Sequence, residues 1–138
     1  MREVKYRGLD VLTGSWVYGN LLTTPAGTYI IPQTLGVNFV QSYQVDKDTV
    51  GQYTGLKDKN NTEVFEGDII QAHTFDENIN KRQIGRVTYH SGRFGYVFIP
   101  KEMEKKNLYY PLFSIVTCEL IGNIYENPEL LEVPHETR

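Results

Sequence analysis

The chain has 138 residues and a formal net charge of −3, and its composition is 40% hydrophobic and 22% charged. This is ordinary for a globular protein and enough for one domain or two small subdomains. No apolar run reaches the length of a membrane span, and the first residues lack the apolar core of a signal peptide. The lone Cys118 cannot form an internal disulfide. We therefore expect a cytoplasmic protein.

Ten tyrosines, six phenylalanines and twelve glycines indicate a chain of strands and turns. In the first part of the chain, residues 4–6 and 16–18 read as strands joined through a turn at 13–15, and Gly19-Asn20 predicts a bulge or sharp bend. Residues 28–31 form a short β-type run. Residues 37–45 alternate apolar and polar positions, which is typical of a half-solvated antiparallel strand. The polar residues 46–49 break the pattern with room for one helical turn.

The stretch Gln52–Ala72 contains two turn signals, at residues 57–61 and 66–68, each flanked by residues that suit strands. We expect Gly55 and Gly67 to serve the conformation of these turns, one or both at positive φ, beside Asp58 and Asp68. Later, residues 84–89 and 94–99 flank His90–Arg93 as the clearest hairpin of the chain.

The rest of the chain predicts less regular structure. Residues 101–106 form a loop or a single turn, because an isolated helix that short is marginal. Residues 112–116 start a short helix or a strand, and residues 118–125 form a last strand. The segment Asn127–Leu131 begins with a cap, an N1 proline and an early acid, which predicts a short C-terminal helix.

Charge is unevenly distributed along the chain. Residues 46–77 hold eight acids and three bases, and residues 81–106 hold seven bases and two acids, so neighbouring segments carry −5 and +5. Residues 107–138 carry −4. The favoured interpretation is that these segments neutralise one another on the folded surface.

Candidate chemical groups were each weighed against a structural role. Four carboxylates within eleven residues, Asp58, Glu63, Glu66 and Asp68, are the kind of cluster that a metal-dependent nuclease needs. They sit in turns, however, where acids serve solubility and local hydrogen bonding. The three histidines, at 73, 90 and 135, lack ligand spacing, and Cys118 beside apolar residues reads as a small buried hydrophobe. We therefore expect no catalytic residues, no metal and no cofactor.

The basic hairpin offers an alternative function. Arg82, Arg86 and Arg93, interleaved with aromatic residues, are candidates for a nucleic-acid face. If they bind phosphate, they should project into solvent together; if the protein acts on other proteins, they should pair with acids of the 46–77 segment or sit apart. The aromatic residues of the hairpin are first of all core candidates, and the net acidic charge weakens phosphate attraction. We favour the second outcome.

Three stretches resemble the YopX family of phage and prophage proteins. They are the start (Arg2–Arg7 with Trp16–Gly19), the middle (Gln52–Asp58 with Glu66–Ile69) and the end (Leu120–Leu131). The chain departs from the family pattern at Asn61, where glycine is usual, but asparagine tolerates the positive φ of a turn.

The resemblance implies a small, mainly β protein of two β subdomains, one of them like an SH3 barrel, and it implies no established activity. Together with the strand pattern, it predicts an N-terminal β subdomain at residues 1–55 and, at 56–138, a small antiparallel SH3-like β-barrel with a C-terminal strand and short helix. For function we expect a non-enzymatic protein-interaction module or self-associating regulatory protein of the bacterial host cytoplasm, with nucleic-acid binding as the alternative.

Overall fold

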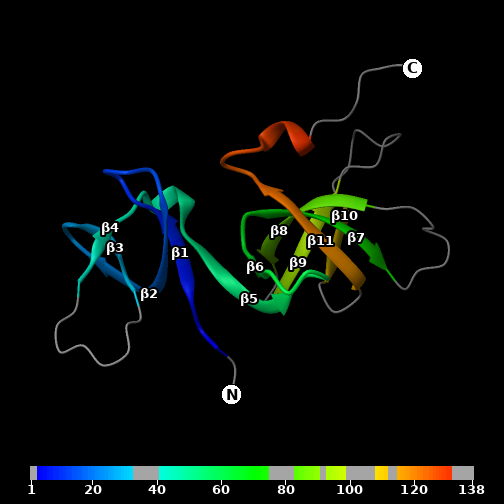
Figure 1. The fold of residues 1–138 in the computed structure, drawn as a ribbon, viewed down its shortest axis with the longest axis horizontal. Helices are drawn as coiled ribbons and strands as arrows, with labels where there is room; N and C mark the ends of the chain where they lie inside the picture. Colours follow the sequence, from blue (N-terminus) through cyan, green and yellow to red (C-terminus); the bar gives the residue numbers. More distant parts are fainter. Residues whose placement is uncertain are drawn as a thin grey trace. The chain divides into compact units, whose positions relative to one another are not determined.

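The structure is a computed structural model that describes residues 3–32, 41–74, 83–90, 93–98, 108–111 and 115–131. It is mainly β: the described residues form antiparallel strands and two short 3₁₀ turns, and they contain no α-helix (Figure 1). The chain divides into two compact units, Met1–Gly55 and Leu56–Arg138, which we call the N-terminal unit and the C-terminal unit. None of the described helical segments is long and apolar enough to cross a membrane.

The N-terminal unit is built from short strands in the sheet order β4-β3-β2-β1-β5. Its elements are β1 (Tyr6–Leu9), β2 (Trp16–Thr24), β3 (Gly27–Ile31), β4 (Tyr43–Gln44), the 3₁₀ turn η1 (Lys47–Thr49) and the beginning of β5 (Gly51–Lys57). Strand β5 continues into the C-terminal unit, where β6 (Glu63–Phe65) follows it in the sheet. The turn expected at residues 46–49 is thus present as η1.

Strand β2 changes its pairing partner at Gly19, where the sequence predicts a bulge or sharp bend, but it continues as one strand. Its first half pairs with β1 through Gly19, and its second half pairs with β3 from Asn20 onward. A Cβ on Gly19 would lie 2.1 Å from the carbonyl oxygen of Ile31, so only glycine lets the two backbones approach this closely. One strand thus belongs to two pairings, and the unit's core contains the buried Ile30 and Val45.

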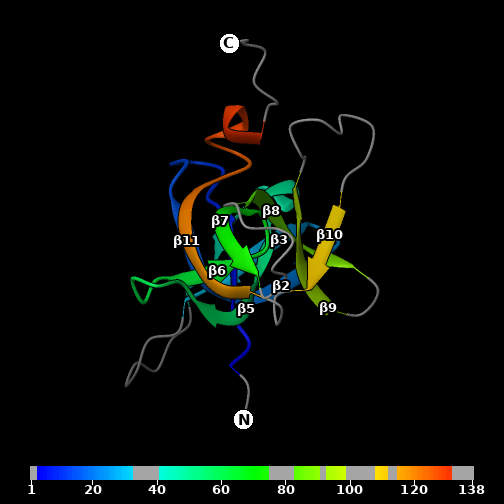
Figure 2. The same cartoon turned by 90° about the vertical axis from the view of Figure 1, so that its right-hand side faces the viewer.

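The C-terminal unit contains an open antiparallel sheet of five strands in the order β10-β9-β8-β7-β11 (Figure 2). They are β7 (Asp68–Thr74), β8 (Gln83–His90), β9 (Arg93–Phe98), β10 (Leu108–Pro111) and β11 (Ile115–Asn123), followed by the 3₁₀ turn η3 (Pro128–Leu131). Strands β8 and β9 are the predicted hairpin, with His90 paired to Arg93. The long β11 runs along β7 with two register irregularities.

One face of this sheet carries the core of the C-terminal unit. Because side chains alternate along a strand, Ile70 and Ala72 of β7 point to the same face, as does Val87 of β8. Val64 of β6 joins these three buried residues, and the partly buried Phe94, Cys118 and Leu120 pack against the cluster. Cys118 therefore behaves as the small apolar residue that the sequence predicts.

The structure corrects two expectations about the C-terminal unit. The predicted SH3-like barrel is not confirmed, because the pairings among the described residues leave β10 and β11 as separate edges rather than closing the sheet. The predicted C-terminal helix is only the four-residue turn η3, in which the N–H of Leu130 donates to Asn127 three residues back. A single such turn follows from the brevity of the segment, since helix nucleation is costly.

Two strand predictions also differ from the structure. The strand expected at residues 37–45 appears only as Tyr43–Gln44 with a bridge at Val45, and residues 37–40 lie outside the described part. Strand β10 was not predicted from the sequence. All four of its residues pair with β9. The strand conformation of β10 is therefore explained by this pairing more than by its own sequence pattern.

Candidate functional site

The turn after β5 is organised by the carboxylate of Asp58. Its Oδ1 accepts hydrogen bonds from the backbone N–H groups of Asn60 and Thr62, both at 2.9 Å. Its Oδ2 accepts from the N–H of Leu120 on β11, also at 2.9 Å. Asp58 is 7% exposed, and both carboxylate oxygens are engaged with the backbone. The side chain therefore fixes a turn and joins it to a distant strand.

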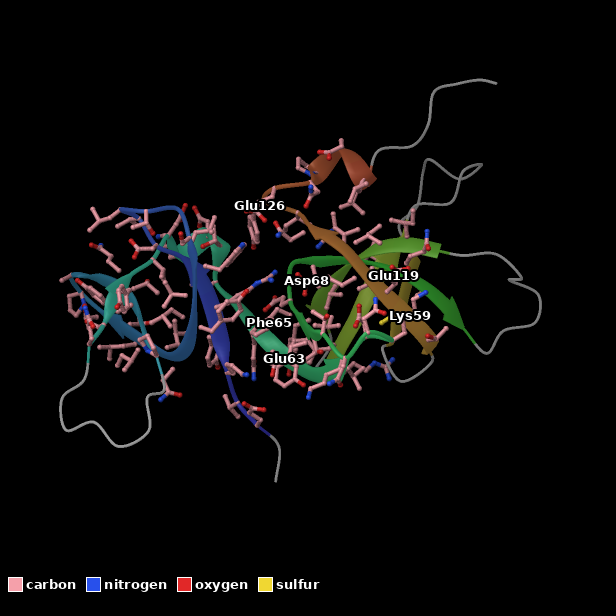
Figure 3. The ribbon with its side chains drawn as sticks, in the orientation of Figure 1. Lys59, Glu63, Phe65, Asp68, Glu119 and Glu126 are labelled. Atoms are coloured by element: carbon pink, nitrogen blue, oxygen red, sulfur yellow. The ribbon has the colours of Figure 1, made fainter. Side chains whose placement is uncertain are left out.

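Two further contacts complete this turn. The N–H of Lys59 donates to the carbonyl of Cys118 at 2.9 Å, and the Lys59 ammonium lies 3.4 Å from the Glu119 carboxylate. Figure 3 shows Lys59 beside Glu119 over β11. Asn61 closes the turn at φ 69°, as expected of asparagine in the place of glycine. We call residues 58–62, with their contacts to β11, the Asp58 clamp.

The Asp58 clamp sets the ionisation of two groups. Burial alone would raise the pKa of Asp58, but the N–H donors of Leu120, Thr62 and Asn60, with the nearby Lys59 charge, hold the pKa below its ordinary value of 3.8. Burial and the Asp58 charge raise the pKa of the Cys118 thiol. Asp58 is therefore suited to remain an anion at neutral pH, and Cys118 is a poor nucleophile.

The second turn signal, Glu66–Asp68, is built in a similar way. Gly67 in this turn has φ 96°, in the region that favours glycine. Gly55 also has a positive φ, 89°, but it lies within strand β5 and not in the turn where the sequence predicts it. The Gly67 N–H donates to the carbonyl of Val87, and Asp68, 1% exposed, accepts a 2.7 Å hydrogen bond from the N–H of Phe65. This turn joins β6 to β7 and holds it against β8.

The end of β11 forms a third hydrogen-bonded turn. The side-chain oxygen of Asn123 accepts from the N–H groups of Tyr125 and Glu126, and Asn127 accepts from the N–H of Asn123 at 3.2 Å. A Cβ on Gly122 would lie 2.6 Å from Oδ1 of Asn127, so a larger residue here would require the Asn127 side chain to move. Gly122, Asn123 and Asn127 thus form one local unit ahead of η3.

The candidate arginines are only partly brought together. Arg86 pairs with Val97, and Arg93 pairs with His90. Cross-strand partners share a face of the sheet, and so do residues four apart on one strand, so Arg86 and Arg93 lie on the same face of the β8–β9 hairpin, opposite Val87. Arg93 is exposed and Arg86 is half-buried. Val97, the partner of Arg86, lies four positions along β9 from Arg93, which is about 13 Å at the rise of a strand. Arg82 lies outside the described residues.

In the part of the chain that the structure describes, the candidate metal ligands do not form a centre. Among the described residues, no three histidine, cysteine, aspartate or glutamate side chains are grouped so as to hold a metal ion. Asp58 and Asp68 belong to different turns with different backbone partners. The histidine side chains lie outside the described part of the structure.

Comparison with known proteins identifies the family. The YopX protein family model matches residues 5–132. The chain belongs to the YopX family. A search of curated proteins gives no match. Among solved structures, the chain is similar to the crystal structure of protein EF1440 from Enterococcus faecalis, with 26% sequence identity and a TM-score of 0.56, over 96% of this chain and 100% of that one.

Two of the three hydrogen-bonded turns lie in the middle stretch that resembles YopX proteins, and the third lies in the end stretch. Asp58 holds the backbone of its turn and of β11, Gly67 adopts a positive φ, and Gly122 lies against the side chain of Asn127. The similarity to EF1440 adds no activity. What the family pattern encodes in this part of the chain is architecture.

Two features of the N-terminal unit were not found by sequence reasoning. The Arg7 guanidinium lies 4.3 Å from the Trp16 ring centroid, and the Lys5 ammonium lies 5.4 Å from that of Tyr53. Arg7 is 5% exposed, so its charge is stabilised beneath the indole. Both cations lie near the start of the chain, Lys5 directly before β1 and Arg7 within it, and nothing in the sequence marks Trp16 or Tyr53 as their partners.

Proposed function

We propose that this YopX protein is a non-enzymatic protein of the phage or prophage cycle, which acts in the bacterial cytoplasm by binding another protein or another copy of itself. One observation carries the proposal: in the middle and end family stretches, the side chains of Asp58, Asp68, Asn123 and Asn127 accept hydrogen bonds from backbone N–H groups. Asp58 alone accepts three backbone hydrogen bonds. A scaffold maintained in this way supports a binding surface rather than a reaction.

The same observation weighs against a metal-dependent nuclease. Such an enzyme needs carboxylate oxygens that are open to a cation and face a phosphate. Both oxygens of Asp58 point at N–H groups, and Asp68 is almost fully buried with one oxygen on Phe65. Turning either carboxylate toward a metal would leave buried N–H groups unpaired, which is costly.

Strand edges give a route to protein binding. The Asp58 clamp occupies the carbonyl of Cys118 and the N–H of Leu120, and so covers part of the edge of β11. The opposite edge of the sheet is β10, and no described strand follows it. Exposed strand edges pair readily with strands of other chains. Because the edge of β11 is partly covered, such pairing would take place at β10.

The proposal is tested by capture from phage-infected bacteria with a tagged chain, in parallel samples with and without nuclease. A protein that is recovered equally in both samples, and that binds the purified chain directly, is the expected result. Recovery that disappears after nuclease treatment would contradict the proposal.

The second candidate function is nucleic-acid binding by the β8–β9 hairpin. It is supported by the position of Arg86 and Arg93 on one sheet face. Phosphate contacts release counterions, so affinity for single- or double-stranded nucleic acid should then fall steeply with salt and weaken further in R86A/R93A. Weak, unselective binding that R86A/R93A does not change would leave the protein-binding function.

A further inference from the structure

The turn between β1 and β2 presents two apolar side chains to solvent. Leu12 is 91% exposed and Val11 is 51% exposed. Single exposed apolar residues are common and need no explanation. Here, however, the two are adjacent at the end of a hairpin, where turn-forming polar residues are the usual choice. We call Val11 and Leu12 the apolar tip.

The apolar tip is held rigidly by hydrogen bonds on both sides. The Asp10 N–H donates to Ser15, the Gly14 N–H donates back to the Asp10 carbonyl, and the Leu12 N–H donates to the Asp10 carboxylate at 2.8 Å. The N–H of Val11 donates to Gln44 at 3.0 Å, which ties the tip to β4. A side chain presented by a fixed backbone loses little conformational entropy when it is buried by a partner.

The surroundings of the apolar tip are acidic. Asp10 bridges Val45, and the Asp46 N–H donates to the carbonyl of Leu9, so the segment at η1 lies directly beside the turn. That segment exposes Asp46 and Asp48 together with a single base, Lys47. Acidic side chains beside an apolar projection are complementary to an apolar pocket bordered by basic side chains, and they are repelled by an anionic lipid surface.

We propose that the apolar tip is the anchor by which this chain binds its protein partner, with Leu12 inserted into an apolar pocket that has a basic rim. This inference deepens the proposed function and rests on it. It assigns the contact to the N-terminal unit, whereas pairing at the β10 edge would assign it to the C-terminal unit.

The first experiment identifies the partner. A photo-crosslinking amino acid is placed at position 12 of the full chain in phage-infected bacteria, and at position 22 as the matched control. Leu22 is also an exposed leucine, 42% accessible, but it lies along β2 away from the turn. The expected result is a protein that is crosslinked from position 12 and absent from position 22. Equal products from both positions would overturn the inference.

The second experiment measures affinity with the purified partner. L12S should weaken binding about tenfold to a hundredfold, the range expected for removing one buried leucine, while L22S stays within about twofold. Because Leu12 is 91% exposed, L12S should keep the melting temperature of the parent chain.

Three results would overturn the inference. If a partner binds with unchanged affinity for L12S, the tip is not the anchor although the proposed function stands. Wild-type binding to anionic phospholipid vesicles that L12S abolishes would assign the tip to a membrane. A dimer in sedimentation that L12S dissociates would make a second copy the occupant. The absence of any protein partner would instead remove the proposed function itself.

Discussion

The carboxylate of Asp58 accepts a 2.9 Å hydrogen bond from the backbone N–H of Leu120, 62 residues further along the chain. The same side chain closes its own turn through Asn60 and Thr62. One residue therefore sets both a local conformation and the docking of that turn on β11. This dual use explains why the most recognisable stretch of the chain carries an acid that performs no chemistry in our account.

Replacing Asp58 tests the clamp. D58A leaves three backbone donors without their acceptor, and we expect a loss of about 3 kcal/mol in the unfolding free energy of the C-terminal unit. D58N keeps one oxygen and should lose less. Native-state hydrogen exchange measures this loss, and faster exchange at the Leu120 amide would show that its hydrogen bond to Asp58 is gone. E119Q, at the exposed ion pair with Lys59, is the control and should cost under about 1 kcal/mol. A similar cost for D58A and E119Q would contradict the clamp.

The clamp also predicts a pH dependence. The pKa of Asp58 is held below 3.8 in the folded chain, so folding favours the ionised carboxylate. Its contribution is fully present above the unfolded pKa and is lost as the pH falls through the folded value. Unfolding of wild type and D58N should be compared from pH 7 to pH 3. The stability advantage of wild type should shrink below about pH 4, and an advantage that stays constant would argue against an ionised acceptor.

Two glycine substitutions separate conformation from crowding. G55A meets no atom within 4 Å and suffers only from φ 89°, so we expect a cost of about 1 kcal/mol. G19A places a Cβ 2.1 Å from the Ile31 carbonyl oxygen, and the backbone must move, so the cost should exceed about 3 kcal/mol. Urea unfolding followed by fluorescence of Trp16, the only tryptophan, reports the N-terminal unit. Equal costs would contradict the close approach of Gly19 to the backbone of Ile31.

The C-terminal turn predicts an energetic coupling. In G122A the new methyl group meets the Asn127 side chain at 2.6 Å, and we expect a loss of about 1–3 kcal/mol. In an N127A background the same change should cost less, because the crowding group is gone. A double-mutant cycle on the unfolding free energy measures this difference. Additive costs would show that Gly122 and Asn127 act independently.

Much of this fold could be predicted from local sequence. The β8–β9 hairpin follows from two β-rich runs around a glycine turn, and the positive φ values of Gly19 and Asn61 follow from residue type. These features depend on a few neighbouring residues, so a single sequence contains the information.

The contacts that define the candidate sites could not be predicted in this way. The Asp58–Leu120 hydrogen bond joins residues far apart in the chain, and neither segment has a sequence feature that indicates contact with the other. Strand β10 depends on pairing with β9, and burial of Arg7 depends on Trp16 across the β1–β2 hairpin. Leucine side chains are usually buried, so the sequence around Leu12 did not indicate that this side chain is exposed.

Isothermal titration calorimetry of the wild-type chain with Mg²⁺, Mn²⁺ and Zn²⁺ tests most directly whether the acids of the family stretch hold the backbone or a cation. Because both oxygens of Asp58 accept backbone hydrogen bonds, the account predicts no stoichiometric binding at neutral pH. D58N and D68N serve as the comparison. A one-to-one isotherm that either substitution abolishes would contradict the account, because it would place a metal where we place a structural clamp.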